Sequence, residues 1–105
     1  MQVVPLDPVP SQTVTVALDG QDCSIRVYQK YSGLFLDLYV AGSLIIGGVI
    51  CQDANRIVRD AYLGFDGDLA FFDNTGSGDP EYTGVGSRYL LVYLTDEDLE
   101  AAGIS

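Results

Sequence analysis

Hydrophobic and polar residues alternate with a period of two along most of the first half of the chain, the pattern typical of β-strands. Residues 11–19, 23–31 and 34–41 each contain apolar side chains at alternate positions, such as Val14, Val16 and Leu18 in the first run and Cys23, Ile25 and Val27 in the second. The clearest alternation places one set of side chains on one face and a second set on the other: Leu34, Leu36, Leu38 and Val40 against Phe35, Asp37 and Tyr39. These residues predict three strands, each with one aliphatic face.

Short turn signals separate the predicted strands. Asp19–Gly20 is a residue pair that favours a tight hairpin, and residues 31–33 and 41–43 also end in or contain glycine. These connections predict an antiparallel meander. Residues 44–51 follow and are apolar at both alternating sets of positions, which predicts a strand buried on both sides. Gly47–Gly48 in its middle predicts a bulge or a close approach of another backbone segment.

The second half of the chain is less regular. Residues 57–65 are compatible with a short strand or with an irregular connection, and residues 69–72 predict a short strand. Residues 74–86 are rich in glycine, serine, aspartate and proline, which predicts a long loop. Residues 89–94 alternate again and predict a final strand.

The C-terminal residues predict one helical turn. Thr95 is suited to cap its start and Asp98 to return the hydrogen bond, and Gly103 would end it. We therefore expect a single all-β domain over residues 1–105, with a core over 1–94 and a tail over 95–105. The expected architecture is a small antiparallel β-sandwich or a partly open β-barrel.

The chain is strongly acidic, with 15 acidic residues, 5 basic residues and a net charge of −10. Nucleic-acid recognition and binding to an anionic membrane both require clustered lysine and arginine, so we predict neither. Two interpretations of the acidity remain open. The charge keeps the protein soluble, or it forms a wall past which DNA slides without binding.

Candidate catalytic chemistry is scarce. The sequence contains no histidine, the commonest general base and metal ligand. No glycine-flanked serine motif or convincing pair of catalytic carboxylates is present. The two cysteines, Cys23 and Cys51, lie in apolar runs and are expected to be buried free thiols. We predict a protein that is not an enzyme and needs no cofactor.

A calcium site is the one metal hypothesis that the sequence suggests. Five acidic residues fall in or beside glycine-containing segments: Asp66, Asp68, Asp73, Asp79 and Glu81. Their spacing does not match a calcium-binding EF-hand loop, and acidic residues are also common in turns. We therefore predict no metal site.

Tyrosine and arginine provide the candidate interaction residues. The chain has seven tyrosines, and both residue types are enriched at protein interfaces. We predict an interface from two groups of residues: Tyr28, Phe35 and Tyr39 on the faces opposite the aliphatic stripes, and Arg56, Arg59, Tyr62 and Phe65 in the less regular second half. Ordinary surface ion pairing is an equally good explanation for the two arginines.

No targeting or membrane-spanning segment is evident. The N-terminus lacks a basic region followed by a long apolar run. The uncharged stretch over residues 38–51 is too short to cross a bilayer and contains three glycines. We expect the chain to be made in the cytoplasm.

Several runs extend the interpretation beyond an acidic β domain. They occur in this order: PSQT (10–13), DGQDC (19–23), YQK (28–30), GLFLDLY (33–39), RIVRDAYLGFDGDL (56–69) and GDPEYTGVGSR (78–88). Together they resemble the phage baseplate plug family, typified by the plug of a contractile-tailed cyanophage. The resemblance extends from residue 1 to about residue 94. Phe72 stands where a smaller aliphatic residue is expected.

The resemblance implies a small β protein in the tail baseplate of a virion. It implies contacts with hub and tube-related proteins near the central channel, and several copies arranged in a ring of trimeric or hexameric symmetry. It also implies synthesis in the host cytoplasm and no catalysis. Two other functions remain open from the residues: a small glycan- or receptor-binding module of a phage tail, or a small cell-wall hydrolase.

Overall fold

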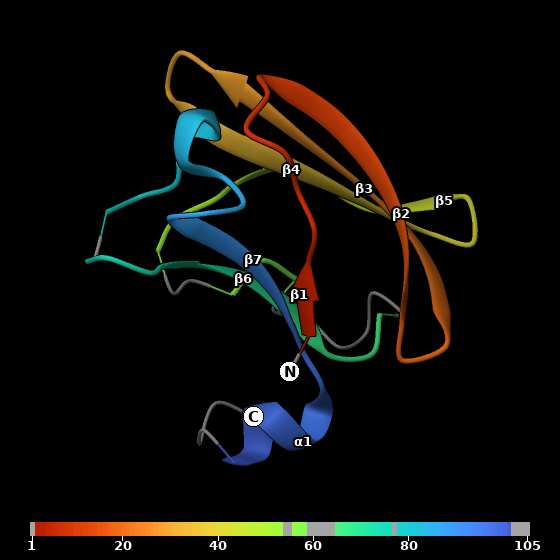
Figure 1. The fold of residues 1–105 in the computed structure, drawn as a ribbon. Helices are drawn as coiled ribbons and strands as arrows, with labels where there is room; N and C mark the ends of the chain where they lie inside the picture. Colours follow the sequence, from red (N-terminus) through yellow and green to blue (C-terminus); the bar gives the residue numbers. More distant parts are fainter. Residues whose placement is uncertain (1, 54–55, 59–64, 77, 102–105) are drawn as a thin grey trace.

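The chain folds into two antiparallel β-sheets that face each other, with a short helix beyond the smaller sheet (Figure 1). A computed structural model describes residues 2–53, 56–58, 65–76 and 78–101. Its elements are β1 (Gln2–Val4), β2 (Ser11–Leu18), β3 (Gln21–Lys30), β4 (Gly33–Val40), β5 (Ser43–Ile50), β6 (Asp68–Asp73), the 3-10 turn η2 (Tyr82–Gly84), β7 (Tyr89–Leu94) and α1 (Asp96–Ala101). The four-stranded sheet has the order β2-β3-β4-β5 and the three-stranded sheet the order β1-β7-β6. The all-β prediction is confirmed. Of the two predicted architectures the fold is the sandwich, since the sheets do not close into a barrel.

The core lies between the two sheets. Ile25, Leu36 and Leu38 from the four-stranded sheet have no exposed surface. Leu69 and Leu91 from the three-stranded sheet are at most 1% exposed. All five belong to one continuous cluster of buried side chains. The aliphatic stripes that alternate along β3 and β4 are therefore the inner face of this sheet, as their period of two predicts.

The predicted meander is confirmed, and its tight turns have the backbone geometry expected for hairpins. Asp19 and Gly20 have φ of 51° and 77°, and Ala41 and Gly42 have φ of 51° and 81°. Two successive residues with positive φ form a turn whose twist matches that of the flanking strands. The register accordingly begins directly at each turn, with Leu18 opposite Gln21 in the first hairpin.

The expectation that residues 44–51 are buried on both sides is wrong for the strand they form. β5 is the last strand of its sheet, and none of its residues is fully buried. Leu44 is 57% exposed and Ile50 is 42% exposed. An apolar run looks the same in a central strand and in an edge strand, so the sequence could not distinguish them. The predicted bulge is confirmed, because the pairing shifts register between Leu36 and Leu38.

The strands predicted in the second half are confirmed as β6 and β7. β1, at the N-terminus, pairs with β7 and was not predicted, since three residues are too few to show a period. Residues 57 and 58 lie outside the strands, whereas residues 59–64 lie outside the described part of the chain. The described residues of the segments 74–76 and 78–86 form the expected loop, apart from η2.

The predicted helical cap is present at the start of α1. The Asp98 N–H donates to Thr95 Oγ1 at 3.2 Å, and the Thr95 N–H donates to Asp98 Oδ2 at 3.1 Å. Leu99 is 5% exposed and packs with Val92 and Leu94 on the side of β7 that faces away from the main core. No helix in the described part of the chain is both long enough and apolar enough to span a membrane.

Candidate functional site

The outer face of the four-stranded sheet carries most of the predicted interface residues that the structure describes. We define this outer face by Arg26, Tyr28, Lys30, Phe35, Asp37 and Tyr39, which alternate with the buried aliphatic residues of β3 and β4. The register brings them together across the two strands: Tyr28 is opposite Phe35, and Arg26 is opposite Asp37. One predicted group, Tyr28, Phe35 and Tyr39, is thus on a single surface.

Two aromatic rings form the centre of the outer face. The rings of Tyr28 and Phe35 are stacked, with centroids 6.1 Å apart and planes inclined by 22°. The Lys30 ammonium lies 5.4 Å from the Tyr28 centroid and 5.6 Å from the Phe35 centroid. The Arg26 guanidinium lies 4.5 Å from the Tyr28 centroid. These distances are within the range of cation–π attraction, so both cations are held close to the rings.

Asp37 holds the Tyr28 and Arg26 side chains in this arrangement. It is only 9% exposed, and its Oδ1 accepts hydrogen bonds from Tyr28 Oη at 3.0 Å and from the Gly48 N–H at 2.7 Å. Its Oδ2 lies 3.6 Å from Arg26 Nη1. Burial, followed by the hydrogen bond to Asp37, raises the pKa of Tyr28, so the hydroxyl stays a donor. Tyr28 is therefore oriented before any partner binds.

The bulge in β5 makes this contact to Asp37 possible. Gly48 has φ of 66°, a conformation that glycine adopts at little cost, and its N–H points to the carboxylate. The sequence predicted the bulge but not its role. No sequence pattern places Gly48 opposite Asp37, because their meeting depends on the irregular pairing of β4 with β5.

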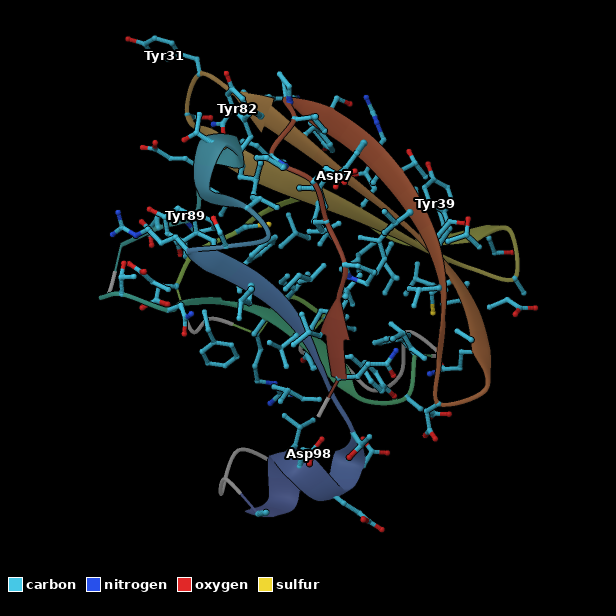
Figure 2. The ribbon with its side chains drawn as sticks, viewed as in Figure 1. Asp7, Tyr31, Tyr39, Tyr82, Tyr89 and Asp98 are labelled. Atoms are coloured by element: carbon cyan, nitrogen blue, oxygen red, sulfur yellow. The ribbon has the colours of Figure 1, made fainter. Side chains whose placement is uncertain are left out.

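Apolar side chains extend the outer face to the edge of the sheet. Ile50 is opposite Phe35, and Leu44 is opposite Tyr39. Both aliphatic residues are exposed, while Tyr39 is half-buried and lies over the same sheet (Figure 2). A surface that combines tyrosine, arginine and exposed aliphatic residues has the composition of the central part of a protein interface.

Arg56 has a structural role instead. Its Nε lies 2.9 Å from Oδ2 of Asp68, a residue with no exposed surface. Oδ1 of the same carboxylate accepts hydrogen bonds from the N–H groups of Ile57, Val58 and Leu69, at 3.1, 2.8 and 2.7 Å. The carboxylate thus joins residues 56–58 to β6. This ion pair is not the ordinary surface pairing considered for Arg56 from the sequence, because the Asp68 carboxylate is fully buried.

Phe65, another predicted interface residue, does not lie on the outer face. Phe65 is 2% exposed, and its ring packs edge-to-face on Tyr93 at a centroid distance of 5.7 Å. Its ring therefore contributes to the core. Arg59 and Tyr62 lie outside the described residues.

Three acidic residues of the calcium hypothesis, Asp68, Asp73 and Asp79, accept hydrogen bonds from the chain's own donors. Asp73 accepts hydrogen bonds from Arg88 Nε at 3.0 Å and Nη2 at 2.9 Å, and from the N–H groups of Thr75 and Gly78. The Arg88 guanidinium holds the pKa of Asp73 well below its usual range. Within the described residues, no group of three or more potential ligands could hold a metal ion.

Comparison with protein families identifies this architecture. A family model described as the cyanophage baseplate Pam3 plug gp18 matches residues 1–97. The chain belongs to this baseplate plug family. A search of curated proteins finds no match.

The match to the plug family covers every described strand and ends within α1. It confirms the resemblance inferred from the sequence, and it supports a structural role in the phage tail baseplate. The plug-family match includes Phe72, which is 37% exposed on β6, on the side away from the main core.

The cysteines of this plug-family chain are buried free thiols, as predicted. Cys23 is fully enclosed and Cys51 is 2% exposed. Burial raises the pKa of Cys51 to about 12, so this thiol stays protonated at neutral pH. A protonated, enclosed thiol is a poor nucleophile, and the two side chains act as small apolar core residues.

Proposed function

We propose that this chain is a non-enzymatic plug or adaptor of the baseplate hub that packs against hub and tube-related proteins near the central channel. The family match over residues 1–97 carries the proposal. The proposed mechanism is steric: the protein fills a position in the hub, and it leaves or rearranges when the tail acts. The proposal includes assembly into the virion after synthesis in the host cytoplasm.

The outer face supports this proposal as the main contact surface. A partner that covers Tyr28 and Phe35 would bury one ring that Asp37 already orients and a second ring that stacks on it, so little side-chain entropy is lost. Buried tyrosine and arginine side chains dominate the binding energy of many interfaces. Leu44 and Ile50 would add apolar area at the edge of the same surface.

Copy number and orientation are further parts of the proposal. We propose several copies in a ring with the trimeric or hexameric symmetry of a hub. In such a ring the outer face contacts a neighbouring protein, and acidic surface elsewhere on the molecule is left to face solvent or the channel. Both interpretations of the net charge of −10, solubility and a non-adhesive channel wall, are compatible with this arrangement.

A pair of phenylalanine variants tests the role of the outer face. Phe35→Ser removes a ring from the outer face, and Phe72→Ser removes an exposed ring from the other sheet. Each variant would replace the native chain in the phage that encodes it, and mass spectrometry of purified tails would measure its incorporation. We expect Phe35→Ser to be depleted at least severalfold relative to Phe72→Ser, because interface anchors concentrate binding energy.

The control for folding is the melting of both purified variants. If Phe35→Ser remains folded and is incorporated as well as Phe72→Ser, the outer face is not the contact surface. If purified wild-type tails contain no copy of this chain, the structural role itself is wrong.

A further inference from the structure

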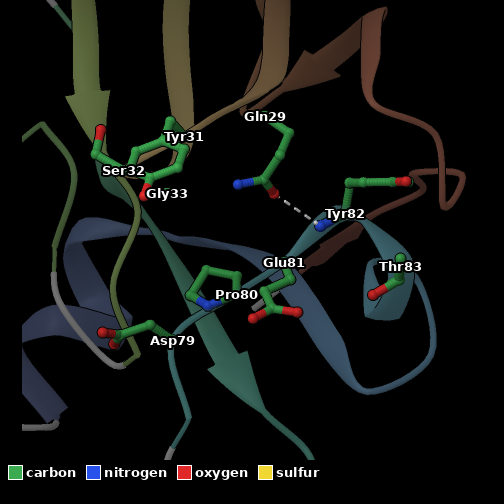
Figure 3. Close-up of a pocket in the computed structure, with 9 residues that line it drawn as sticks. All are labelled: Gln29, Tyr31, Ser32, Gly33, Asp79, Pro80, Glu81, Tyr82 and Thr83. Atoms are coloured by element: carbon green, nitrogen blue, oxygen red, sulfur yellow. Dashed lines mark hydrogen bonds between the residues drawn. The ribbon is translucent and has the colours of Figure 1, made fainter.

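A pocket of about 350 Å³ opens at the end of the sandwich next to the β3–β4 turn (Figure 3). Tyr31 lies on the turn side of the pocket, and Asp79, Glu81 and Tyr82 come from the loop on the opposite side. The outer face does not include these residues. The pocket therefore combines two tyrosine rings with two carboxylates at a separate place on the molecule.

Hydrogen bonds fix the loop side of the pocket. Gln29 Oε1 accepts the Tyr82 N–H at 3.1 Å, and Gln29 Nε2 donates to the carbonyl oxygen of Lys30 at 2.9 Å. Oδ1 of Asp79 accepts the Asp53 N–H at 3.1 Å. The loop is thus joined both to the four-stranded sheet and to the segment after β5, so the pocket is a built part of the fold.

Two groups at the pocket have no partner in the described part of the chain. The exposed Glu81 carboxylate makes no hydrogen bond or ion pair there, and the Tyr31 side chain projects fully into solvent (Figure 2). None of the lining residues is basic. Glu81 interacts electrostatically with Arg88. The pKa of Arg88 is raised chiefly by its hydrogen bond to Asp73, and Glu81 is a lesser cause. Its guanidinium is held by Asp73, outside the pocket lining.

Two of the chain's own arginines, Arg26 and Arg88, show what such a combination of residues binds. Arg26 lies 4.5 Å from the Tyr28 centroid and 3.6 Å from Asp37. Arg88 lies 4.9 Å from the centroid of Tyr89 and 2.9 Å from Asp73. Each guanidinium thus has a tyrosine ring and a carboxylate as neighbours. The pocket offers the same two kinds of group without a guanidinium between them.

We propose that this pocket binds an arginine side chain of a partner protein, with Glu81 as the ion-pair acceptor and Tyr31 as the ring that contacts the guanidinium. The net charge of −10 favours approach of a basic segment to the molecule as a whole. The inference rests on the proposed function only in taking the partner to be another protein of the assembly. The preference of the pocket for guanidinium can be tested without any baseplate component.

The test is an NMR titration of the full-length protein with N-acetyl-arginine N-methylamide. The control probe is the corresponding citrulline compound, which has nearly the same shape but no charge. We expect saturable shifts of the Ser32, Gly33 and Thr83 amide signals with the arginine compound, and much smaller shifts with the citrulline compound.

Matched variants assign the shifts to the proposed contacts. Glu81→Gln should weaken binding by about three- to fivefold, the range of an exposed ion pair. Asp22→Asn removes one exposed carboxylate outside the pocket and should leave binding unchanged. Tyr31→Ala should weaken binding by about threefold, whereas Tyr31→Phe should keep it, because the ring face and not the hydroxyl makes the contact.

Three outcomes overturn the proposal. One is equal binding of the arginine and citrulline compounds. Another is a set of shifts spread over the acidic surface that Glu81→Gln and Asp22→Asn weaken to the same extent, which indicates non-specific attraction. The third is saturable binding of a neutral sugar such as N-acetylglucosamine with no response to arginine, which makes the pocket a glycan site. None of these results bears on whether the chain is present in tails.

Discussion

Three aspartates have the same role at the residue scale: each pairs with an arginine and also accepts backbone N–H groups. Asp37 pairs with Arg26 and accepts the Gly48 N–H of the β5 bulge. Asp68 joins residues 56–58 to β6, and Asp73 closes the loop that follows β6. Each carboxylate thereby satisfies backbone N–H groups of an irregular segment and joins that segment to a neighbouring strand. The arginine neutralises a charge that would otherwise be costly to enclose.

The most buried of these groups gives the sharpest stability prediction. Asp68→Asn replaces one acceptor oxygen with a donor, so the Asn amide must oppose either Arg56 or the N–H groups of Ile57, Val58 and Leu69. We expect the free energy of unfolding to fall by about 3 kcal/mol, the typical result of disrupting a buried ion pair. Urea denaturation measures it. Asp66→Asn, two residues away on the exposed surface, should change the stability by less than about 0.5 kcal/mol. Equal effects of the two substitutions would contradict this role.

Asp73 predicts a pH dependence of stability. Its pKa is lower in the folded chain than in the unfolded chain, chiefly because of Arg88. A carboxyl group of this kind stabilises the fold above its unfolded pKa of about 3.9, and the contribution is lost as the pH falls further. The difference in unfolding free energy between the wild type and Asp73→Asn should therefore be largest near neutral pH and shrink below about pH 4. Denaturation curves across this range measure it, and a constant difference would contradict the assignment.

At the scale of elements, the tight turns set which residues of neighbouring strands pair with each other. Asp19 and Ala41 have the same φ of 51° at equivalent turn positions, but alanine tolerates this conformation less well than aspartate or asparagine. We expect Ala41→Asn to raise the unfolding free energy by about 1 kcal/mol and Asp19→Ala to lower it by a similar amount. Thermal or urea denaturation of both variants tests the pair. A loss of stability in Ala41→Asn would be inconsistent with the turn geometry.

The packing of α1 gives a second prediction at this scale. Leu99 contacts Val92 and Leu94 and is 5% exposed, whereas Leu44 is 57% exposed. Replacing leucine with alanine at both positions makes the same chemical change, so a difference in stability between the variants reports how closely each side chain is packed. Leu99→Ala should lower the unfolding free energy by about 2–3 kcal/mol, and Leu44→Ala by less than about 1 kcal/mol. Similar values for the two variants would show that α1 does not pack on β7 in solution.

Regular alternation and turn residues were enough to predict most of the elements. They predicted β2 to β4, the hairpin turns, the β5 bulge, β7 and the cap of α1. They could not predict β1, because its three residues form a strand only by pairing with β7. The paired residues are at least 87 positions apart in the sequence. They also misplaced β5, because apolar composition does not report whether a strand is central or at an edge.

Only part of the candidate site could be predicted at this level. The aromatic outer face follows from the alternation in β3 and β4, so Tyr28, Phe35 and Tyr39 were found from the sequence. The contacts of Asp37 and Asp68, and the core position of Phe65, depend on which strands pair and where irregular segments pack. The pocket beside Tyr31 is also tertiary, since its two sides are far apart in sequence.

The two surfaces of the sandwich differ at the scale of the whole molecule. One sheet presents aromatic rings with Arg26 and Lys30 beside them, although the molecule as a whole carries a net charge of −10. The other sheet is partly covered by α1. A small domain with one ordered aromatic surface fits a protein that is packed into a larger assembly. This asymmetry is the physical basis of the proposed plug role.

The most direct test is a cryo-electron microscopy structure of the assembled baseplate at side-chain resolution, from the phage that encodes this chain. The account predicts that the chain occupies the hub and that Tyr28, Phe35 and Tyr39 are buried against another protein chain. A hub that lacks the chain, or a bound chain whose outer face is open to solvent, would contradict it.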